Sequence, residues 1–286
     1  MIELHAVDVA VQRSSKRWHS ALSVLLFFVS LLLTLPLLAS VSAQSQKAAS
    51  ATGKPVSGEK QANASLLKPY TAELKGSIKG LPMTASGSRT LQKNSAGDWE
   101  LVFDANAGLF GIKESSSFHV DAKGHIQPDA YQFKRSGFIG SKKEESAEFD
   151  WKKSQVKWSK KDKQWAIALK SGALDNLSYQ TQLRMDLAAG KTNLKYLIAD
   201  DDEVYEREFS IVGEEVINTE AGKLNTVKIK VNRDNDKRET YIWFAKDWDY
   251  FFVKLLQKEG GSEYTVEIKN ATIDGKPIEG IKDAST

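Results

Sequence analysis

The stretch ETYIWFAKDWDYFFVKLL, from Glu239 to Leu256, places seven aromatic side chains around the two acids Asp247 and Asp249. This composition fits either a binding site with aromatic walls and a carboxylate pair or the core of a β-hairpin. Apolar residues alternate on both sides of residues 246–249, and Asp favours turns because its side chain hydrogen-bonds the local backbone. We therefore predict two strands joined by a tight turn, and we do not interpret the two acids as a catalytic pair.

Both faces of this predicted hairpin are apolar. Ile242 and Phe244 lie on one face of its first strand, and Tyr241 and Trp243 lie on the other. Large exposed apolar patches are rare, so the second face needs a cover. We expect a helix of the same chain to supply that cover, with a ligand or a partner as the alternative.

Alternation of apolar and polar residues extends through the rest of the chain. The clearest runs are DWELVFD (98–104), KQWAIAL (163–169), NTVKIKV (225–231) and EYTVEIK (263–269). Such alternation is typical of antiparallel strands with one buried and one hydrated face, and turn signals separate about a dozen of these runs. We predict one all-β domain at residues 68–276, a mainly antiparallel barrel-like or strongly curved sheet, followed by a C-terminal tail at residues 277–286.

One segment differs from the strands in its periodicity. In GALDNLSYQTQLRMDLAAGK, residues 172–191, Asp175 is a candidate N-cap and Gly190 stands where a helix would end. Three leucines of this segment fall nearly on one helical stripe: Leu177, Leu183 and Leu187. We predict one α-helix at residues 176–189 that packs on a face or an open end of the sheet.

The N-terminus has the pattern of an export signal. Basic residues at positions 13–17 precede an apolar run at 21–38, which is followed by the small residues Val41-Ser42-Ala43. We predict a signal peptide at residues 1–43 that is cleaved after Ala43, with an uncleaved membrane anchor as the alternative. Residues 44–67 are rich in Ala, Ser, Gln, Gly and Lys, so we predict a flexible linker. In either case the body of the protein lies outside the cytoplasm.

The composition excludes several classes of function. The formal net charge of +3 is small for 286 residues, which argues against a nucleic-acid partner. The chain has no Cys, which excludes thiol catalysis, disulfides and Cys-ligated zinc. His119 and His125 lack the spacing of metal ligands, and no nucleotide-binding or nucleophile motif is present. We predict no catalytic residue, no metal site, no cofactor and no enzymatic activity.

Arg207 is unusual because it shares one face of its strand with Tyr205 and Phe209. An arginine on an apolar face needs a carboxylate partner or a hydrated lumen. It either fixes the head of a ligand inside a barrel, or pairs with an inward-facing acid or lies near a strand end. Together with the hairpin aromatics it gives the candidate ligand-binding residues Arg207, Trp243, Tyr241, Phe252 and Tyr205.

Residues 141–169 interleave lysines with three tryptophans. Such a surface suits anionic lipid headgroups or a cell-wall polymer. However, Val156 and Trp158 share a face that Lys157 opposes, which favours a hairpin with Trp inside and Lys outside. We prefer the hairpin interpretation.

Two motifs of the C-terminal half resemble a known family. They are GEEVINTEAGKL (213–224) and WFAKD (243–247), and they follow the helix candidate in the same order as in the bacterial exported family called domain of unknown function 3108. Members often carry a Pro just before the V-K pair, where this chain has Phe252. The resemblance implies a periplasmic β-barrel-like fold, and it brings no established catalytic residue.

From these observations we expect a non-enzymatic periplasmic envelope protein. It would bind a lipid, a glycan or another apolar ligand in a half-open barrel, which is a shape that can hold such a ligand. The alternative is a structural or assembly factor of the envelope that acts through protein–protein contacts. The expected partner is a lipid or another envelope component, with no nucleic acid and no membrane span after cleavage.

Overall fold

The computed structural model describes residues 66–281, except residues 81, 83, 109 and 138–141. The predicted signal peptide, nearly all of the predicted linker and the last five residues of the predicted tail lie outside the described residues. No helix in the described part of the chain is long and apolar enough to cross a membrane.

The described chain is built almost entirely of β-strands. The strands are β1 (Tyr70–Ile78), β2 (Thr84–Lys93), β3 (Trp99–Ala107), β4 (Phe110–Val120), β5 (Ile126–Ser136), β6 (Lys143–Asp150), β7 (Gln155–Lys160), β8 (Lys163–Ala168), β9 (Ala173–Leu174), β10 (Leu194–Asp200), β11 (Glu203–Thr219), β12 (Gly222–Val231), β13 (Arg238–Ala245), β14 (Phe251–Glu259), β15 (Ser262–Ile273) and β16 (Lys276–Pro277). One α-helix, α3 (Ser178–Ala188), and one short 3-10 helix, η1 (Lys246–Trp248), complete the described elements.

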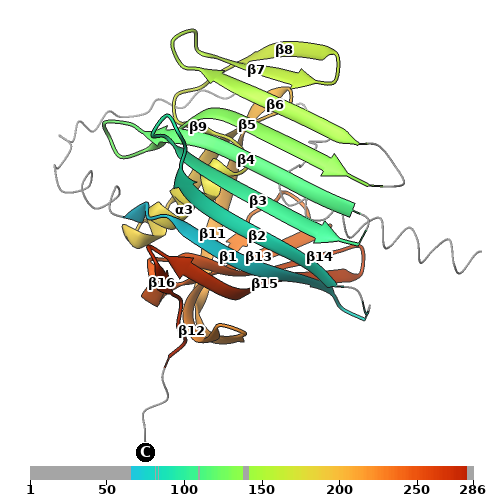
Figure 1. Cartoon of the computed structure of the whole chain (residues 1–286), viewed down its shortest axis with the longest axis vertical. Coiled ribbons are helices and arrows are strands. Elements are labelled where there is room, and N and C mark those ends of the chain that lie inside the picture. The colour runs from blue at the N-terminus through green and yellow to red at the C-terminus, as the bar shows by residue number, and fades with distance from the viewer. Residues whose placement is uncertain (1–65, 81, 83, 109, 138–141, 282–286) are drawn as a thin grey trace, which may run out of the picture.

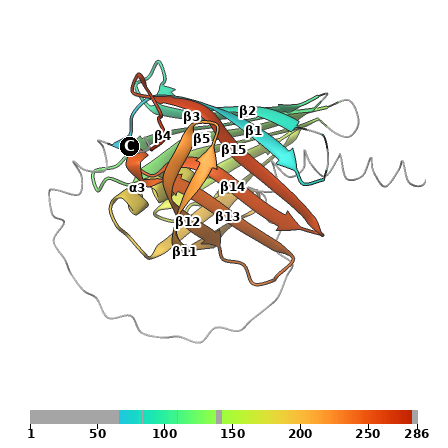
Figure 2. The same ribbon diagram turned by 90° about the horizontal axis from the view of Figure 1, so that it is seen from below.

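All strands belong to one curved sheet. Its order is β8-β7-β6-β5-β4-β3-β2-β1-β15-β14-β13-β12-β11-β10-β9, and β16 pairs with β15. The pairing is antiparallel throughout, except between β9 and β10. The sheet curves around α3 without closing into a barrel, since β8 and β9 are its two edges (Figures 1 and 2). The prediction of a mainly antiparallel, strongly curved sheet with one packed helix is confirmed.

Helix α3 forms close to where the sequence predicts it. Asp175 Oδ1 accepts hydrogen bonds from the backbone N–H groups of Leu177 and Ser178, at 2.8 and 2.7 Å. At the other end Gly190 has a φ of +74°, in the left-handed region that glycine adopts without strain. Nine of the eleven helical residues are buried, so the helix fills the concave side of the sheet instead of lying on its surface.

The hairpin of β13 and β14 has its turn at the predicted place. Residues 246–248 form η1, and the turn is completed by Asp249 and Tyr250, which have φ values of +52° and +57°. The pairing register shifts between Trp243 and Phe244, so that Phe244 lies opposite Phe252. This bulge places aromatic side chains of both strands around the interior.

The expected cover of the hairpin's second face was wrong. Helix α3 packs on the Ile242 and Phe244 side, whereas Tyr241 and Trp243 lie on the opposite face. There the ammonium group of Lys228 lies 4.9 Å from the ring centres of both Tyr241 and Trp243. Lysine stems cover aromatic rings well while the charge stays in water. The outer face is therefore covered by the sheet's own side chains.

The lysine-rich segment forms a hairpin with Trp158 inside and Trp165 half-buried beside it. Val156 and Trp158 are fully buried, and Lys157 is exposed. The ring of Trp165 stacks on that of Trp158 with centroids 6.5 Å apart, and Trp165 Nε1 donates a 2.8 Å hydrogen bond to the carbonyl of Asp201. Edge strand β8 is thereby tied to the turn between β10 and β11, which narrows the open side of the sheet.

The first residues of the predicted tail, 277–281, make close backbone contact with the start of β12. Ile281 N donates to the carbonyl of Lys223 at 2.7 Å, and a Cβ on Gly280 would lie 2.7 Å from Lys223 N and 2.8 Å from Gly222 Cα. We expect Gly280→Ala to lower the free energy of unfolding by about 1–3 kcal/mol, because the backbone must move apart. Gly213→Ala is the matched control, since its Cβ would meet nothing within 4 Å. Equal denaturation midpoints of the two variants would contradict this contact.

Candidate functional site

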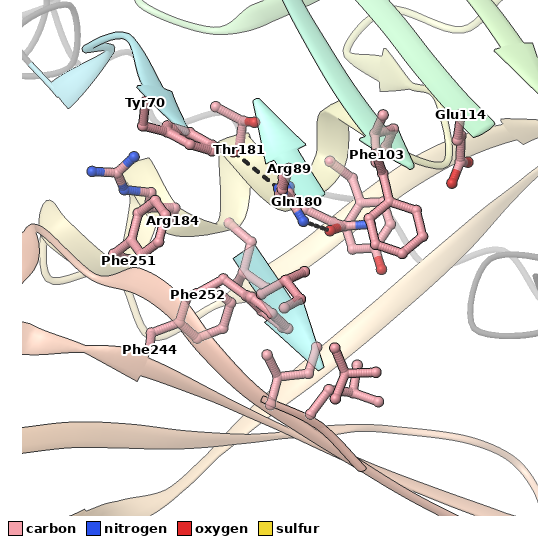
Figure 3. A pocket seen from close by; sticks show the side chains of 17 residues that line it. Tyr70, Arg89, Phe103, Glu114, Gln180, Thr181, Arg184, Phe244, Phe251 and Phe252 are labelled. Atoms are coloured by element: carbon pink, nitrogen blue, oxygen red, sulfur yellow. Dashed lines mark hydrogen bonds between the residues drawn. The ribbon is translucent and has the colours of Figure 1, made fainter. Parts of the chain in front are cut away.

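A pocket lies between α3 and the concave face of the sheet, where β1, β2, β13 and β14 approach the helix (Figure 3). The cavity volume for water-sized molecules is about 70 Å³, and all space between the lining side chains, open mouth included, is about 860 Å³. Several waters fit in the smaller volume. The pocket is therefore a narrow space with an open mouth.

Most of the pocket wall is apolar. Its aromatic members are Tyr70, Phe103, Tyr179, Phe244, Phe251 and Phe252. The rings of Phe244 and Phe252 meet edge to face with centroids 6.4 Å apart, as do those of Tyr70 and Phe251 at 4.9 Å. Aliphatic side chains from α3 and the hairpin fill the spaces between them. Such a wall binds apolar groups by removing them from water.

Two arginines interrupt this apolar wall. Arg89 Nε donates to Tyr70 Oη at 2.9 Å, and Arg89 Nη1 donates to Gln180 Oε1 at 2.5 Å. Arg184 Nε donates to the backbone carbonyl of Asp249 at 2.9 Å, which links α3 to the turn of the hairpin. Burial, and to a lesser degree the nearby charge of Arg89, lowers the pKa of Arg184.

Glu114 is the carboxyl group of the described pocket wall. Burial raises its pKa to about 8, although Tyr131 Oη donates a 2.5 Å hydrogen bond to Oε1. Its second oxygen, Oε2, is buried without a hydrogen-bond partner in the described structure. Burial also raises the pKa of Asp175 and of Asp200 to about 6. Within the described residues, no group of three or more acids or histidines is placed to hold a metal ion.

The five candidate residues of the sequence occupy three different places. Phe252 lines the pocket, whereas Tyr241 and Trp243 lie on the outer face of the hairpin. Arg207 and Tyr205 lie together on β11, and the Arg207 guanidinium is 5.4 Å from the Tyr205 ring centre. The same guanidinium lies 4.8 Å from the ring of Tyr179, which also lines the pocket. Arg207 thus supports the pocket wall from behind.

The residues predicted from the sequence do not include Arg89, Arg184 and Glu114 of the pocket wall. Arg89 shares a strand face with Ala85, Gly87 and Leu91, and Glu114 shares a face with Ile112 and Phe118 on β4. This is the same signal that drew attention to Arg207, a charged residue on the apolar face of a strand. Arg184 carries no such signal, because the sequence of α3 resembles that of a half-exposed helix.

Comparison with known proteins identifies the family. A family model described as "Protein of unknown function (DUF3108)" matches residues 89–269, which is more than half of the chain. The chain belongs to this family, and the resemblance inferred from the two C-terminal motifs is confirmed. No curated protein matches the sequence.

Solved structures resemble the fold. One is the β-barrel-like protein of domain of unknown function DUF1849 from Brucella abortus, with a TM-score of 0.50, 11% identity, and coverage of 72% of this chain and 98% of that chain. Another is MucB in complex with MucA(peri), with a TM-score of 0.28, 12% identity, and coverage of 75% and 54%. At these identities the likeness concerns the fold alone, and the second TM-score is too low to support any argument.

Proposed function

We propose that this protein is a non-enzymatic, exported envelope protein that binds the apolar chain of an amphiphile in the pocket under α3. The supporting observation is the apolar wall, in which Phe244, Phe251 and Phe252 face Leu177 and Leu183 of the helix. Export is supported by the basic and apolar pattern of the first 43 residues. The absence of a nucleophile–base pair among the motifs of the sequence supports a binding role.

The dimensions of the pocket favour a linear ligand. A cavity of about 70 Å³ for water-sized molecules, bordered by phenyl rings, has room for the end of a thin chain, and the rest of the chain would lie in the open mouth. Each methylene that enters such a wall contributes about 0.8 kcal/mol of transfer free energy. A chain of several methylenes therefore gains measurable affinity without any specific polar contact.

Filling the pocket should weaken this binding. Val266 is partly buried, lies opposite Leu255 on the neighbouring strand and borders the pocket. We expect Val266→Phe to weaken binding of dodecanol, measured by calorimetry, by roughly tenfold or more, equal to about 1.4 kcal/mol. Native mass spectrometry of protein purified from envelopes should show a bound apolar molecule on the wild type and not on this variant.

The neighbouring change Thr265→Phe is the matched control, because Thr265 is outside the described pocket wall. It should leave dodecanol binding unchanged. Absence of dodecanol binding to the wild type, together with no co-purified molecule, would reject the proposed function.

An assembly role has one specific observation in its favour. The side chains of Ile211, Val212 and Val216 on β11 are large and apolar, yet they are 42, 52 and 55% exposed. Exposed apolar residues of this kind often mark protein contacts. If the protein acts through this surface, Val212→Asp should reduce its crosslinking to an envelope protein and leave dodecanol binding intact.

A further inference from the structure

Two buried arginines face the same pocket and have neutral partners. Arg89 on β2 is 7% exposed and Arg184 on α3 is 5% exposed. Their hydrogen bonds go to a tyrosine hydroxyl, a glutamine amide oxygen and a backbone carbonyl. Arg184 Nη2 is buried and has no hydrogen-bond partner in the described part of the chain. A buried guanidinium normally has a carboxylate or phosphate against it, because desolvation of an uncompensated charge is costly.

The pocket wall does little to offset these two charges, since the Asp249 carboxylate that acts on Arg184 lies outside the wall and pairs with Lys68 Nζ at 3.1 Å. Guanidinium groups remain protonated in proteins, so both side chains keep their positive charge. The carboxyl group of the described wall belongs to Glu114, and burial raises its pKa to about 8. It is therefore mostly protonated at pH 7. The pocket combines an apolar wall with a net positive charge.

We propose that the pocket selects amphiphiles whose single apolar chain ends in an anionic head, a carboxylate or a phosphate, held by Arg89 and Arg184. This inference rests on the proposed function, since it names the class of ligand that the same pocket takes. Arginine presents a planar fork of N–H donors that matches the oxygens of both head groups. The unpartnered Nη2 of Arg184 supplies one donor that the protein itself leaves unused.

The aromatic rings place the charged groups next to the apolar wall. The guanidinium carbon of Arg184 lies 5.4 Å from the ring centre of Phe251, and that of Arg89 lies 5.8 Å from the ring centre of Phe252. Arg184 and Phe251 lie side by side at one end of the pocket, and Glu114 lies at the other end (Figure 3). A head group bound at the arginines leaves its chain against the phenyl rings.

A series of probes with one chain and four heads tests this inference. Calorimetry at pH 7 with the purified protein would use dodecanoate, dodecyl phosphate, dodecanol and dodecyltrimethylammonium, each below its micelle concentration. We expect one or both anions to bind at least roughly tenfold more tightly than dodecanol, because a hydrogen bond to a charged group is stronger than one to a neutral group. A preference for dodecanoate over the phosphate, or the reverse, would assign the head group within the anionic class.

The probe series separates failure of the anionic-head inference from failure of the proposed function. If dodecanol and the anions bind equally well, or if the ammonium probe binds best, the anionic head is rejected while the proposed function stands. If no probe binds, the proposed function fails and the head-group inference fails with it.

Arginine variants locate the head group. Arg184→Met should remove most of the preference for anions, measured as the ratio of dodecanoate to dodecanol affinity within the same variant, because methionine keeps an apolar stem and loses the charge. Arg238→Met is the matched control, since Arg238 pairs with Glu259 at 2.8 Å and does not line the pocket. Should Arg184→Met fail to fold, Arg89→Met gives the same readout. An unchanged anion preference in a folded Arg184→Met or Arg89→Met variant would overturn the assignment.

Discussion

Replacing Asp175 with alanine should lower the free energy of unfolding by about 2–4 kcal/mol, because one carboxylate serves three donors at the start of α3. Oδ1 accepts the backbone N–H groups of Leu177 and Ser178, and Oδ2 accepts the hydroxyl of Ser116 at 2.5 Å. All of these groups are buried, so each donor that loses its acceptor has no water to replace it. The effect is measured by urea denaturation at pH 7.

The loss should extend to ligand binding. Helix α3 carries Leu177, Leu183 and Arg184 into the pocket, and Asp175 ties its first turn to β4. We expect the Asp175→Ala variant to lose dodecanol binding before it unfolds globally. Ser117→Ala, next to the Asp175 contact on β4 but with its side chain less buried, is the control and should change stability by less than about 0.5 kcal/mol. Identical midpoints for the two variants would show that the Asp175 contacts do not stabilise the helix.

The strands and the ends of the helix can be predicted from residues that are neighbours in the sequence. Period-two runs such as NTVKIKV predict strands because one face of each strand is buried, and the structure places Val227 and Ile229 in the core. Asp175 and Gly190 predict the ends of α3 to within two residues, because caps satisfy backbone groups locally. These features depend on neighbours in the sequence, so a single sequence contains the information.

The site depends on contacts between distant parts of the chain. The pocket residues Arg89, Glu114 and Arg184 come from β2, β4 and α3. A single sequence does not indicate that these three elements enclose one pocket. The sequence predicts the helix on the outer face of the hairpin because both faces of the hairpin are apolar and the second one needs a cover. In the structure most of the polar residues of α3 are buried and hydrogen-bonded, as when Gln182 Oε1 accepts the backbone N–H of Ile126 at 2.9 Å. The polar side chains of α3 therefore take part in hydrogen bonds inside the protein and do not mark a solvent-exposed face.

Glu114 should make the stability of the protein fall as the pH rises from about 4.5 to about 8. Burial raises its pKa from 4.5 to about 8 in the folded state. The folded protein therefore holds this proton where the unfolded chain has lost it, and stability that is complete below pH 4.5 is lost as the pH approaches 8. The loss is on the order of 3–5 kcal/mol, because each unit of difference between the folded and unfolded pKa corresponds to about 1.4 kcal/mol.

Glu114→Gln removes this titration and keeps an oxygen that accepts the hydroxyl of Tyr131. The difference in unfolding free energy between wild type and variant, followed by urea denaturation from pH 4.5 to 9, should be small at pH 4.5, favour the variant increasingly up to about pH 8, and level off above it. Asp175, Asp200 and Arg89, which also act electrostatically on Glu114, are present in both proteins, so the difference reports Glu114 together with its coupling to them. Glu144→Gln, an exposed carboxyl on β6, is the control and should give a nearly flat difference.

The same carboxyl connects stability to the proposed ligand. Above pH 8 an ionised Glu114 adds a negative charge to the pocket wall, which opposes an anionic head held by Arg89 and Arg184. Dodecanoate, which is fully ionised at both values, should therefore bind the wild type more weakly at pH 9 than at pH 7, whereas the Glu114→Gln variant should bind it equally at both. Dodecanol carries no charge, and its affinity should be independent of pH in both proteins. A fall in dodecanoate affinity that persists in Glu114→Gln would assign the pH effect to another group and separate Glu114 from ligand recognition.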